Sequence, residues 1–233
     1  MNFLKIKNFL LVFLIIFSYL ISVVKTYAVD ITADRTISSS SDGDQYNIKT
    51  NNDIDVIVTN NSTLERNQKI FNVSAASLTG SSITIHVGSS VIAETNSIFS
   101  NGAELTITNT GTIEATNSKA INVSNSDGVS ITNNNNGVIK SNNNTILGDA
   151  GTGADNVTID NSGEIYTTAT GTESSAIVFA NNDTGNTITN NSGGEIYSSG
   201  SESTIVLGVS STLTNSGSIK NNKSVTNKAI QLK

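Results

Sequence analysis

Polar and apolar residues alternate along most of this chain in short runs that recur about every 25 residues. The clearest unit runs from Leu105 to Ile113, in which Ile107 lies between two threonines, as a half-buried strand requires. An Asn ends this strand, a Gly follows, and a second strand closes with an isoleucine. Related units are Val129–Ile139, Val157–Ile165, Thr187–Ile196 and Thr212–Ile219, with a weaker copy at Ile83–Ile92.

A third apolar segment follows each unit, so that one repeat holds three short strands. The closing isoleucines are spaced by 26, 26, 31 and 23 residues, and they are Ile113, Ile139, Ile165, Ile196 and Ile219. The third segments contain Ala120-Ile121, Ile146-Leu147, Ala176-Ile177, Ile205-Val206 and Ala229-Ile230.

Such a repeat cannot bury its apolar side chains alone, but stacked repeats bury them in a continuous column. We therefore expect an all-β fold, a single-stranded right-handed parallel β-helix (β-solenoid) with three short strands per coil and about eight coils. Residues 29–61 are expected to form an N-terminal cap and first coil, and residues 62–233 the β-helix repeats. Within these regions, Asp34–Asp44 is interpreted as a Ser-rich connector, and Thr63–Lys69 is the one segment where a short helix could form.

Two columns of small residues follow from aligning the repeats. The asparagines Asn109, Asn133, Asn161, Asn190 and Asn215 are expected to form a structural ladder of stacked amides along the axis. A row of amides that binds a ligand is the alternative. The glycines of the same repeats, which we expect at turns, are Gly111, Gly137, Gly163, Gly193 and Gly217.

The N-terminus carries the features of a secretory signal peptide. Lys5 and Lys7 precede an apolar run from Phe9 to Val24, and a small residue, Ala28, offers a cleavage site. The alternative, an uncleaved membrane anchor, is disfavoured because the run has 16 residues where a spanning helix needs about 20. We therefore expect a signal peptide at residues 1–28 and no transmembrane segment in the mature chain.

Composition narrows the range of functions. The chain lacks cysteine, which excludes disulfides and cysteine-ligated metals, and its only histidine is His86. Removal of residues 1–28 leaves 10 Lys and Arg against 19 Asp and Glu, a net charge of −9 that disfavours anionic partners such as nucleic acid. An exported chain of this size without disulfides is typical of bacteria. No cofactor and no metal site are expected.

The signal peptide followed by Thr-Ile-Thr-Asn-x-Gly-x-Ile repeats resembles the β-helical passenger region of bacterial autotransporters and related haemagglutinin-like surface proteins. The resemblance covers the layout of residues 1–233 and, in detail, residues 83–219. It implies a secreted or cell-surface location on the exterior of the outer membrane, with the periplasm as the alternative. The repeats run on to Ile219 without the alternating ten-residue strands of a membrane barrel, so a separate outer-membrane translocator is a possible partner.

Candidate chemistry on the repeats is sparse. Asp160, Glu164 and Glu195 form the best acidic group, although solvated carboxylates on a β-face are the more economical interpretation. His86 is expected to point outward from a strand. Paired threonine positions make a regular array that resembles an ice-binding face, and these are Thr106/Thr108, Ser130/Thr132, Thr187/Thr189 and Thr212/Thr214.

Three functions therefore stand as hypotheses. The first is a structural or adhesive surface protein without catalysis, whose partner is an unidentified surface, glycan or cell. The second is a β-helical carbohydrate-active enzyme, which the scarcity of Arg and His disfavours. The third is an ice-binding type of regular surface, which the unequal repeat lengths and the interruption at Asp160 disfavour.

Overall fold

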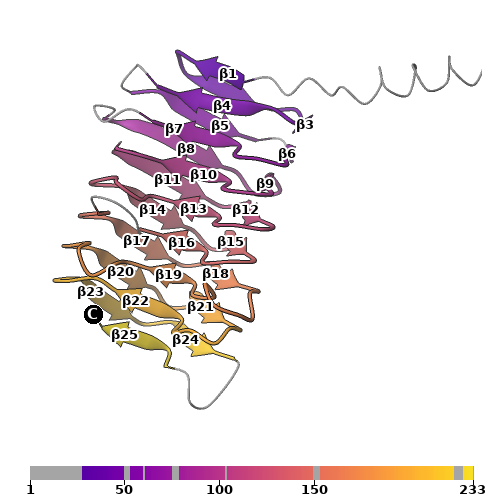
Figure 1. The fold of residues 1–233 in the computed structure, drawn as a ribbon. Coiled ribbons are helices and arrows are strands. Elements are labelled where there is room, and N and C mark those ends of the chain that lie inside the picture. The colour runs from indigo at the N-terminus through magenta and orange to yellow at the C-terminus, as the bar shows by residue number, and fades with distance from the viewer. Residues whose placement is uncertain are drawn as a thin grey trace, which may run out of the picture.

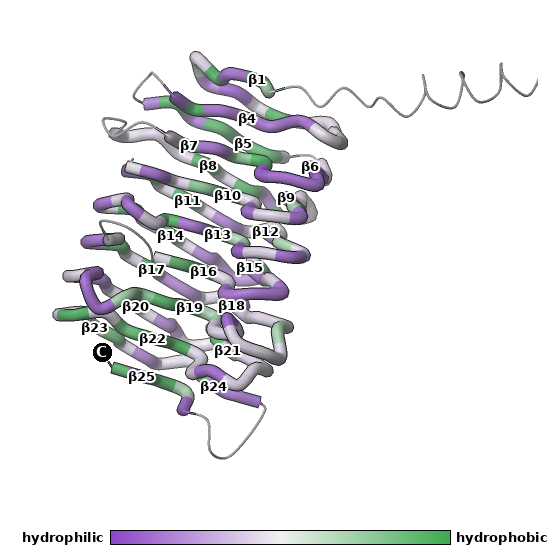
Figure 2. Tube along the Cα trace, viewed as in Figure 1, coloured by the Kyte–Doolittle hydropathy of each residue, from purple (hydrophilic) through white to green (hydrophobic). Residues whose placement is uncertain are grey.

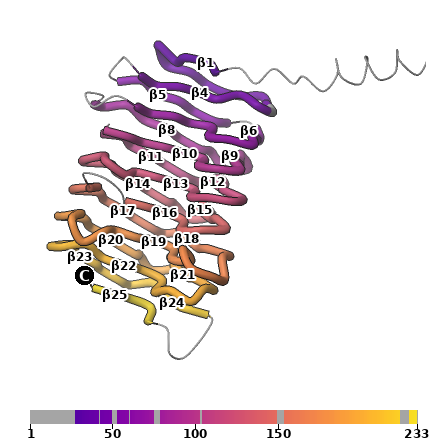
Figure 3. The backbone as a smooth tube through the Cα atoms, viewed as in Figure 1, coloured from indigo at the N-terminus to yellow at the C-terminus, as the bar shows by residue number. Residues whose placement is uncertain are grey.

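The computed structural model describes residues 28–49, 53–59, 61–74, 79–102, 104–148, 153–222 and 228–232. Within these residues the chain coils into a parallel β-solenoid of three sheets, and each coil places one strand in each sheet. Successive coils lie directly on one another from β1 at one end to β25 at the other (Figures 1 and 3). The expected all-β parallel fold with three strands per coil is thus confirmed. Of the signal peptide predicted at residues 1–28, residues 1–27 lie outside the described residues.

The third segment of each repeat forms sheet A. Its strands are β1 (Ala28–Ile31), β4 (Gln45–Ile48), β7 (Phe71–Val73), β10 (Ile98–Ser100), β13 (Ile121–Asn122), β16 (Ile146–Leu147), β19 (Ile177–Val178), β22 (Ile205–Leu207) and β25 (Ile230–Leu232).

The first segment of each repeat, with its Thr-x-Thr alternation, forms sheet B. Its strands are β2 (Arg35–Ile37), β5 (Asp55–Val58), β8 (Ser81–Ile85), β11 (Leu105–Asn109), β14 (Ser130–Asn133), β17 (Thr158–Asn161), β20 (Thr187–Asn190) and β23 (Thr212–Asn215).

The second segment forms sheet C. Its strands are β3 (Ser41–Asp42), β6 (Thr63–Arg66), β9 (Ser90–Ala93), β12 (Thr112–Ala115), β15 (Val138–Ser141), β18 (Glu164–Thr167), β21 (Glu195–Ser198) and β24 (Ser218–Asn221).

Apolar side chains at alternate positions point into the space enclosed by the three sheets. On sheet B, Ile107, Ile131, Ile159 and Ile188 are adjacent in register and fully buried, and Leu213 continues their column. Leu213 is only partly buried because β23 is the last described strand of its sheet. The closing isoleucines form an equivalent column on sheet C, listed by register as Ile113, Ile139, Ile165, Ile196 and Ile219.

Sheet A also carries apolar side chains on its outer face. Leu147, Val178 and Val206 are in register on β16, β19 and β22, and they form a second, smaller cluster separate from the main core. Figure 2 shows these strands as hydrophobic segments in the C-terminal half of sheet A. Because each of these side chains is at most 9% exposed, this part of the outer face is not free surface.

Three local predictions were wrong. The segment expected as a connector, Asp34–Asp44, contains strands β2 and β3, because Ile37 reaches the core despite its polar neighbours. The possible helix at Thr63–Lys69 is strand β6 up to Arg66, whose Leu64 is buried. In the weaker repeat at Ile83–Ile92, Val91 and not Ile92 occupies the column of Ile113, so the buried position of this strand lies one residue earlier than expected.

No helix among the described residues is both long and apolar enough to cross a membrane.

The buried column of sheet B yields the first prediction. Replacing Ile159 with Asp places an unpaired carboxylate in the core, so the free energy of unfolding should fall by more than about 4 kcal/mol in urea titrations. Thr158→Asp, the neighbouring exposed position on the same strand, is the matched control and should change it by less than about 1 kcal/mol. Equal stability of the two variants would contradict the placement of Ile159.

Candidate binding surfaces

The asparagines of the repeats stack inside the solenoid at the end of sheet B. The Nδ2 of Asn109 donates to the Oδ1 of Asn133 at 2.8 Å, and the same bond recurs at 2.8 Å from Asn133 to Asn161, from Asn161 to Asn190 and from Asn190 to Asn215. Each of these donor amides also contacts the carbonyl oxygen of the glycine in its own turn. Four of the asparagines are fully buried, so this part of the ladder is internal, and Asn215 at its end is exposed; the four are Asn109, Asn133, Asn161 and Asn190.

Glycine is needed beside this ladder because the turn lies against the preceding coil. A Cβ atom on Gly111 would lie 2.3 Å from the carbonyl oxygen of Ser89 and 2.5 Å from that of His86. In the repeat at Thr187–Ile196, Gly193 lies in the turn as expected, but the residue in the place of Gly111 is Gly194. Gly193 has a φ of 89° at the tip of a longer turn, where only glycine adopts the left-handed region freely.

The acidic group expected from sequence does not converge. Asp160 lies on sheet B and accepts a hydrogen bond from the Nδ2 of Asn191. Glu164 and Glu195 are in-register neighbours on sheet C, where Glu164 accepts a bond of 3.2 Å from the hydroxyl of Tyr197. Glu195 forms a 3.8 Å ion pair with Lys220. Asp160 is thus engaged on one wall of the solenoid and the two glutamates on another.

Sheet C carries an aromatic and charged column that the sequence reasoning missed. Glu114, Lys140, Tyr166, Tyr197 and Lys220 follow one another in register on its outer face. The rings of the two tyrosines stack with centroids 4.6 Å apart and an interplanar angle of 7°, and Lys140 pairs with Glu114 at 2.9 Å. The recurrence of Gly-Glu-Ile-Tyr in two repeats was the signal that could have revealed this column.

Two side chains of this column have pKa values shifted by their surroundings. Burial raises the pKa of the Tyr197 hydroxyl, and the nearby Glu164 adds to the effect. The hydrogen bond to Glu114 raises the pKa of the Lys140 ammonium. Tyrosine combines an apolar ring with a polar hydroxyl and is enriched at protein interfaces, so the column is suited to contact with a partner.

Sheet B displays two columns of hydroxyl side chains on its outer face. The first column in register is Ser82, Thr106, Ser130, Thr158, Thr187 and Thr212. The second is Thr84, Thr108, Thr132, Asp160, Thr189 and Thr214. Unequal repeat lengths do not disturb these columns, because the additional residues lie in the turns.

His86 lies outside the hydroxyl columns. It follows β8 (Ser81–Ile85) in an exposed turn and is not a strand residue, contrary to expectation. Its Nδ1 lies 3.4 Å from the hydroxyl oxygen of Thr59. In the part of the chain that the structure describes, no group of three or more His, Asp or Glu residues could hold a metal ion.

Comparison with known proteins adds no relative: no protein-family model, no curated protein and no solved structure matches this chain.

The amide ladder yields the second prediction. Asn161→Ala removes two buried bonds of the ladder, the one from the Asn133 amide and the one to the Oδ1 of Asn190, and at about 0.5–1.5 kcal/mol each their loss costs about 1–3 kcal/mol. The free energy of unfolding, measured with urea, should fall by that order. Asn215→Ala, at the exposed end of the ladder, is the control and should cost less than about 1 kcal/mol. A larger loss of unfolding free energy in Asn215→Ala than in Asn161→Ala would contradict the conclusion that the buried amides stabilise the fold.

Proposed function

We propose that this protein is an exported bacterial β-solenoid that acts as a structural or adhesive surface protein, by contact and without catalytic turnover. The observation that carries the proposal is the regular outer face of sheet B. Six successive strands from β8 to β23 each contribute two outward positions, at the strand spacing of about 4.8 Å. A rigid wall of repeated hydrogen-bonding groups is suited to many weak contacts made together.

The export part of the proposal rests on the N-terminal sequence. Cationic, apolar and small-residue segments follow one another up to Ala28, and the first strand, β1, starts at this residue. Cleavage after Ala28 would make Val29, which packs against the core, the first residue of the solenoid. The resemblance to autotransporter passengers supports display on the outer membrane.

The export proposal yields the third prediction. Protein recovered from the producing cell should begin at Val29, as read by N-terminal sequencing or intact mass. Ala28→Asp, which removes the small residue from the cleavage site, should retain the leader. Recovery of a chain that still starts at Met1, embedded in a membrane, would refute a cleaved signal peptide.

The adhesive role yields the fourth prediction. Beads coated with many copies of residues 29–233 should be retained on cells or glycan surfaces at least about 100-fold better than the single protein, because repeated weak contacts add up. A variant with lysine at Thr108, Thr132 and Thr189, three outward positions of sheet B, should lose this retention and keep its stability. No gain from display would contradict the proposal, and depolymerisation of a polysaccharide would contradict the absence of catalysis.

The register of the hydroxyl columns also favours a second candidate, an ice-binding surface. The same coated and single proteins can be tested for thermal hysteresis, with the triple lysine variant as control. Ice-growth inhibition lost in that variant would assign sheet B to ice and not to cells. The interruption of the second column by Asp160 is the reason that the adhesive role is preferred.

A further inference from the structure

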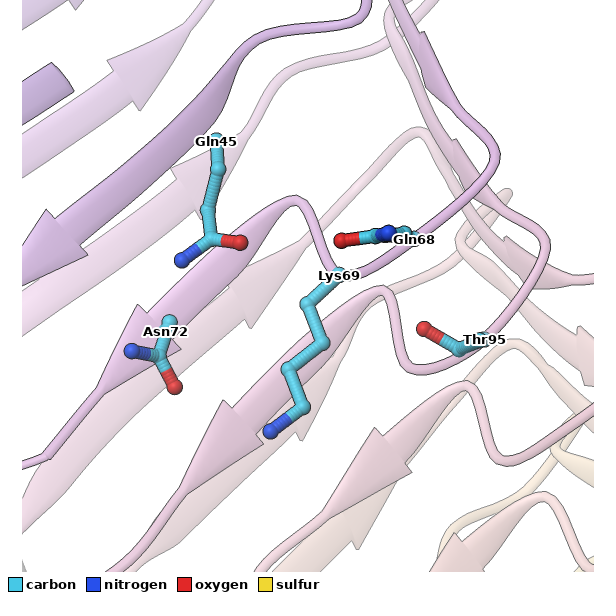
Figure 4. A pocket seen from close by; sticks show the side chains of 5 residues that line it. All are labelled: Gln45, Gln68, Lys69, Asn72 and Thr95. Atoms are coloured by element: carbon cyan, nitrogen blue, oxygen red, sulfur yellow. The ribbon is translucent and has the colours of Figure 1, made fainter. Parts of the chain in front are cut away.

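A hollow of about 420 Å³ opens at the corner where the chain passes from sheet C to sheet A. It is lined by Gln45 of β4, Asn72 of β7, Gln68 and Lys69 of the turn between β6 and β7, and Thr95 of the next turn. Figure 4 shows the Lys69 side chain running between Asn72 and Thr95, with Gln45 and Gln68 near its base. The volume lies within the range of about 300–1,000 Å³ that is common for small-molecule sites.

Hydrogen bonds among the described residues use some polar groups of this lining, such as the Nδ2 of Asn72, which donates to the Oδ1 of Asn47 at 3.2 Å, and leave other donors. The guanidinium of Arg66 donates to the Oε1 of Gln45 at 3.1 Å and to the Oε1 of Gln68 at 3.5 Å, which occupies the acceptor oxygens of both amides. The ammonium of Lys69, the Nε2 of Gln68 and the hydroxyl of Thr95 then remain as donors in the lining. A ligand rich in acceptor oxygens matches this arrangement.

Lys69 adds a positive charge that is partly desolvated. Its Nζ lies 3.5 Å from the centroid of the Phe99 ring. The four ion pairs found among the described residues use other lysines, namely Lys49, Lys119, Lys140 and Lys220. Burial lowers the pKa of the Lys69 ammonium, and a carboxylate at this position would counter that effect by favouring the charged form.

The net negative charge of the chain does not exclude an anion at this corner. Solvent-exposed charges more than about 8 Å apart are largely screened at physiological salt, so the nearest groups decide local affinity. Those groups include Lys69 and Arg66, with Asp44 as the carboxylate that acts electrostatically on Arg66. The amide and hydroxyl groups beside them suit the hydroxyls of a sugar better than they suit a bare inorganic anion.

We propose that this hollow binds one carboxylate-bearing sugar, a uronic or sialic acid residue of a surface glycan. The sugar carboxylate contacts the ammonium of Lys69, and its hydroxyls contact Gln68, Asn72 and Thr95. The Phe99 ring holds the ammonium in position. The inference rests on the proposed adhesive function, for which it names the ligand class.

The test is a titration of residues 29–233, followed by nuclear magnetic resonance, with methyl β-glucuronide and the methyl glycoside of N-acetylneuraminic acid. At least one of the two should shift the amide resonances of Asn72 and Thr95 and bind at least 10-fold more tightly than methyl β-glucoside, the neutral analogue. Inorganic phosphate is the probe for a simple anion site. Equal binding of the acidic and neutral sugars, or phosphate binding as tight as that of the better acidic sugar, would overturn the proposal.

Variants test whether the positive charge of Lys69, and not a change in the fold, accounts for binding. Lys69→Met keeps the apolar stem and should weaken acidic-sugar binding at least 10-fold, whereas Lys140→Met, on the outer face of sheet C, should leave it unchanged. Thr95→Val, which preserves side-chain shape, should weaken binding about 5-fold and serves if Lys69→Met does not fold. An unchanged affinity for the acidic sugar in a folded Lys69→Met protein, or in Thr95→Val, would contradict the proposed site.

The two proposals fail in different ways. If coated beads attach to cells and Lys69→Met beads attach equally well, the adhesive role stands and the sugar site is wrong. If the single protein binds the acidic sugar but coated beads attach to nothing, the site stands and the adhesive role is wrong.

Discussion

In-register pairing of parallel coils is the constraint on which the rest of this structure depends. Side chains alternate between core and solvent along each strand, so a slip of one residue would expose every buried isoleucine. Two devices hold the register. Columns of branched apolar residues fill the interior, and from Asn109 onward the amide ladder links each coil to the next at one defined residue. In earlier coils the same column holds the apolar residues Val58 and Ile85, and polar links between coils lie on sheet A, where the Nδ2 of Asn72 donates to the Oδ1 of Asn47 at 3.2 Å.

The ladder also explains how coils of unequal length remain aligned. In each repeat the Asn and the glycine after it stand at fixed places against the preceding coil, and the chain between them can be longer. Two intervening residues are added before Gly137 and before Gly194 relative to the turn at Gly111, and each longer turn has a residue with positive φ just before the glycine. Length variation is therefore confined to turns, and the sheets remain regular.

Much of the fold could be predicted from sequence because its signals are local. Thr-Ile-Thr followed by Asn and Gly specifies a strand, its buried side chain and its end within eight residues. Segments with a single apolar anchor were harder. Ile37 alone places β2, and Leu64 alone places β6, and neither is enough to show a period of two. Val91 and Ile92 are both apolar, and only pairing with Ile113 decides which of them faces the core.

The candidate sites were less predictable because they are made between coils. Tyr166 and Tyr197 are 31 residues apart, and Gln45 and Thr95 are 50 apart, so only the register brings each pair to one surface. The same dependence separates Asp160 from Glu164, which are close in sequence and lie on different walls.

The outer surfaces of the solenoid therefore differ in the kind of contact that they can make with a partner. Hydroxyl columns repeat from coil to coil and offer many equivalent contacts, whereas the hollow beside Lys69 is formed by residues of three neighbouring coils and offers a single specific one. Because the buried columns set the register, outward residues can vary one by one without disturbing the coil. A solenoid can in this way combine broad, weak attachment on one wall with selective recognition at a corner.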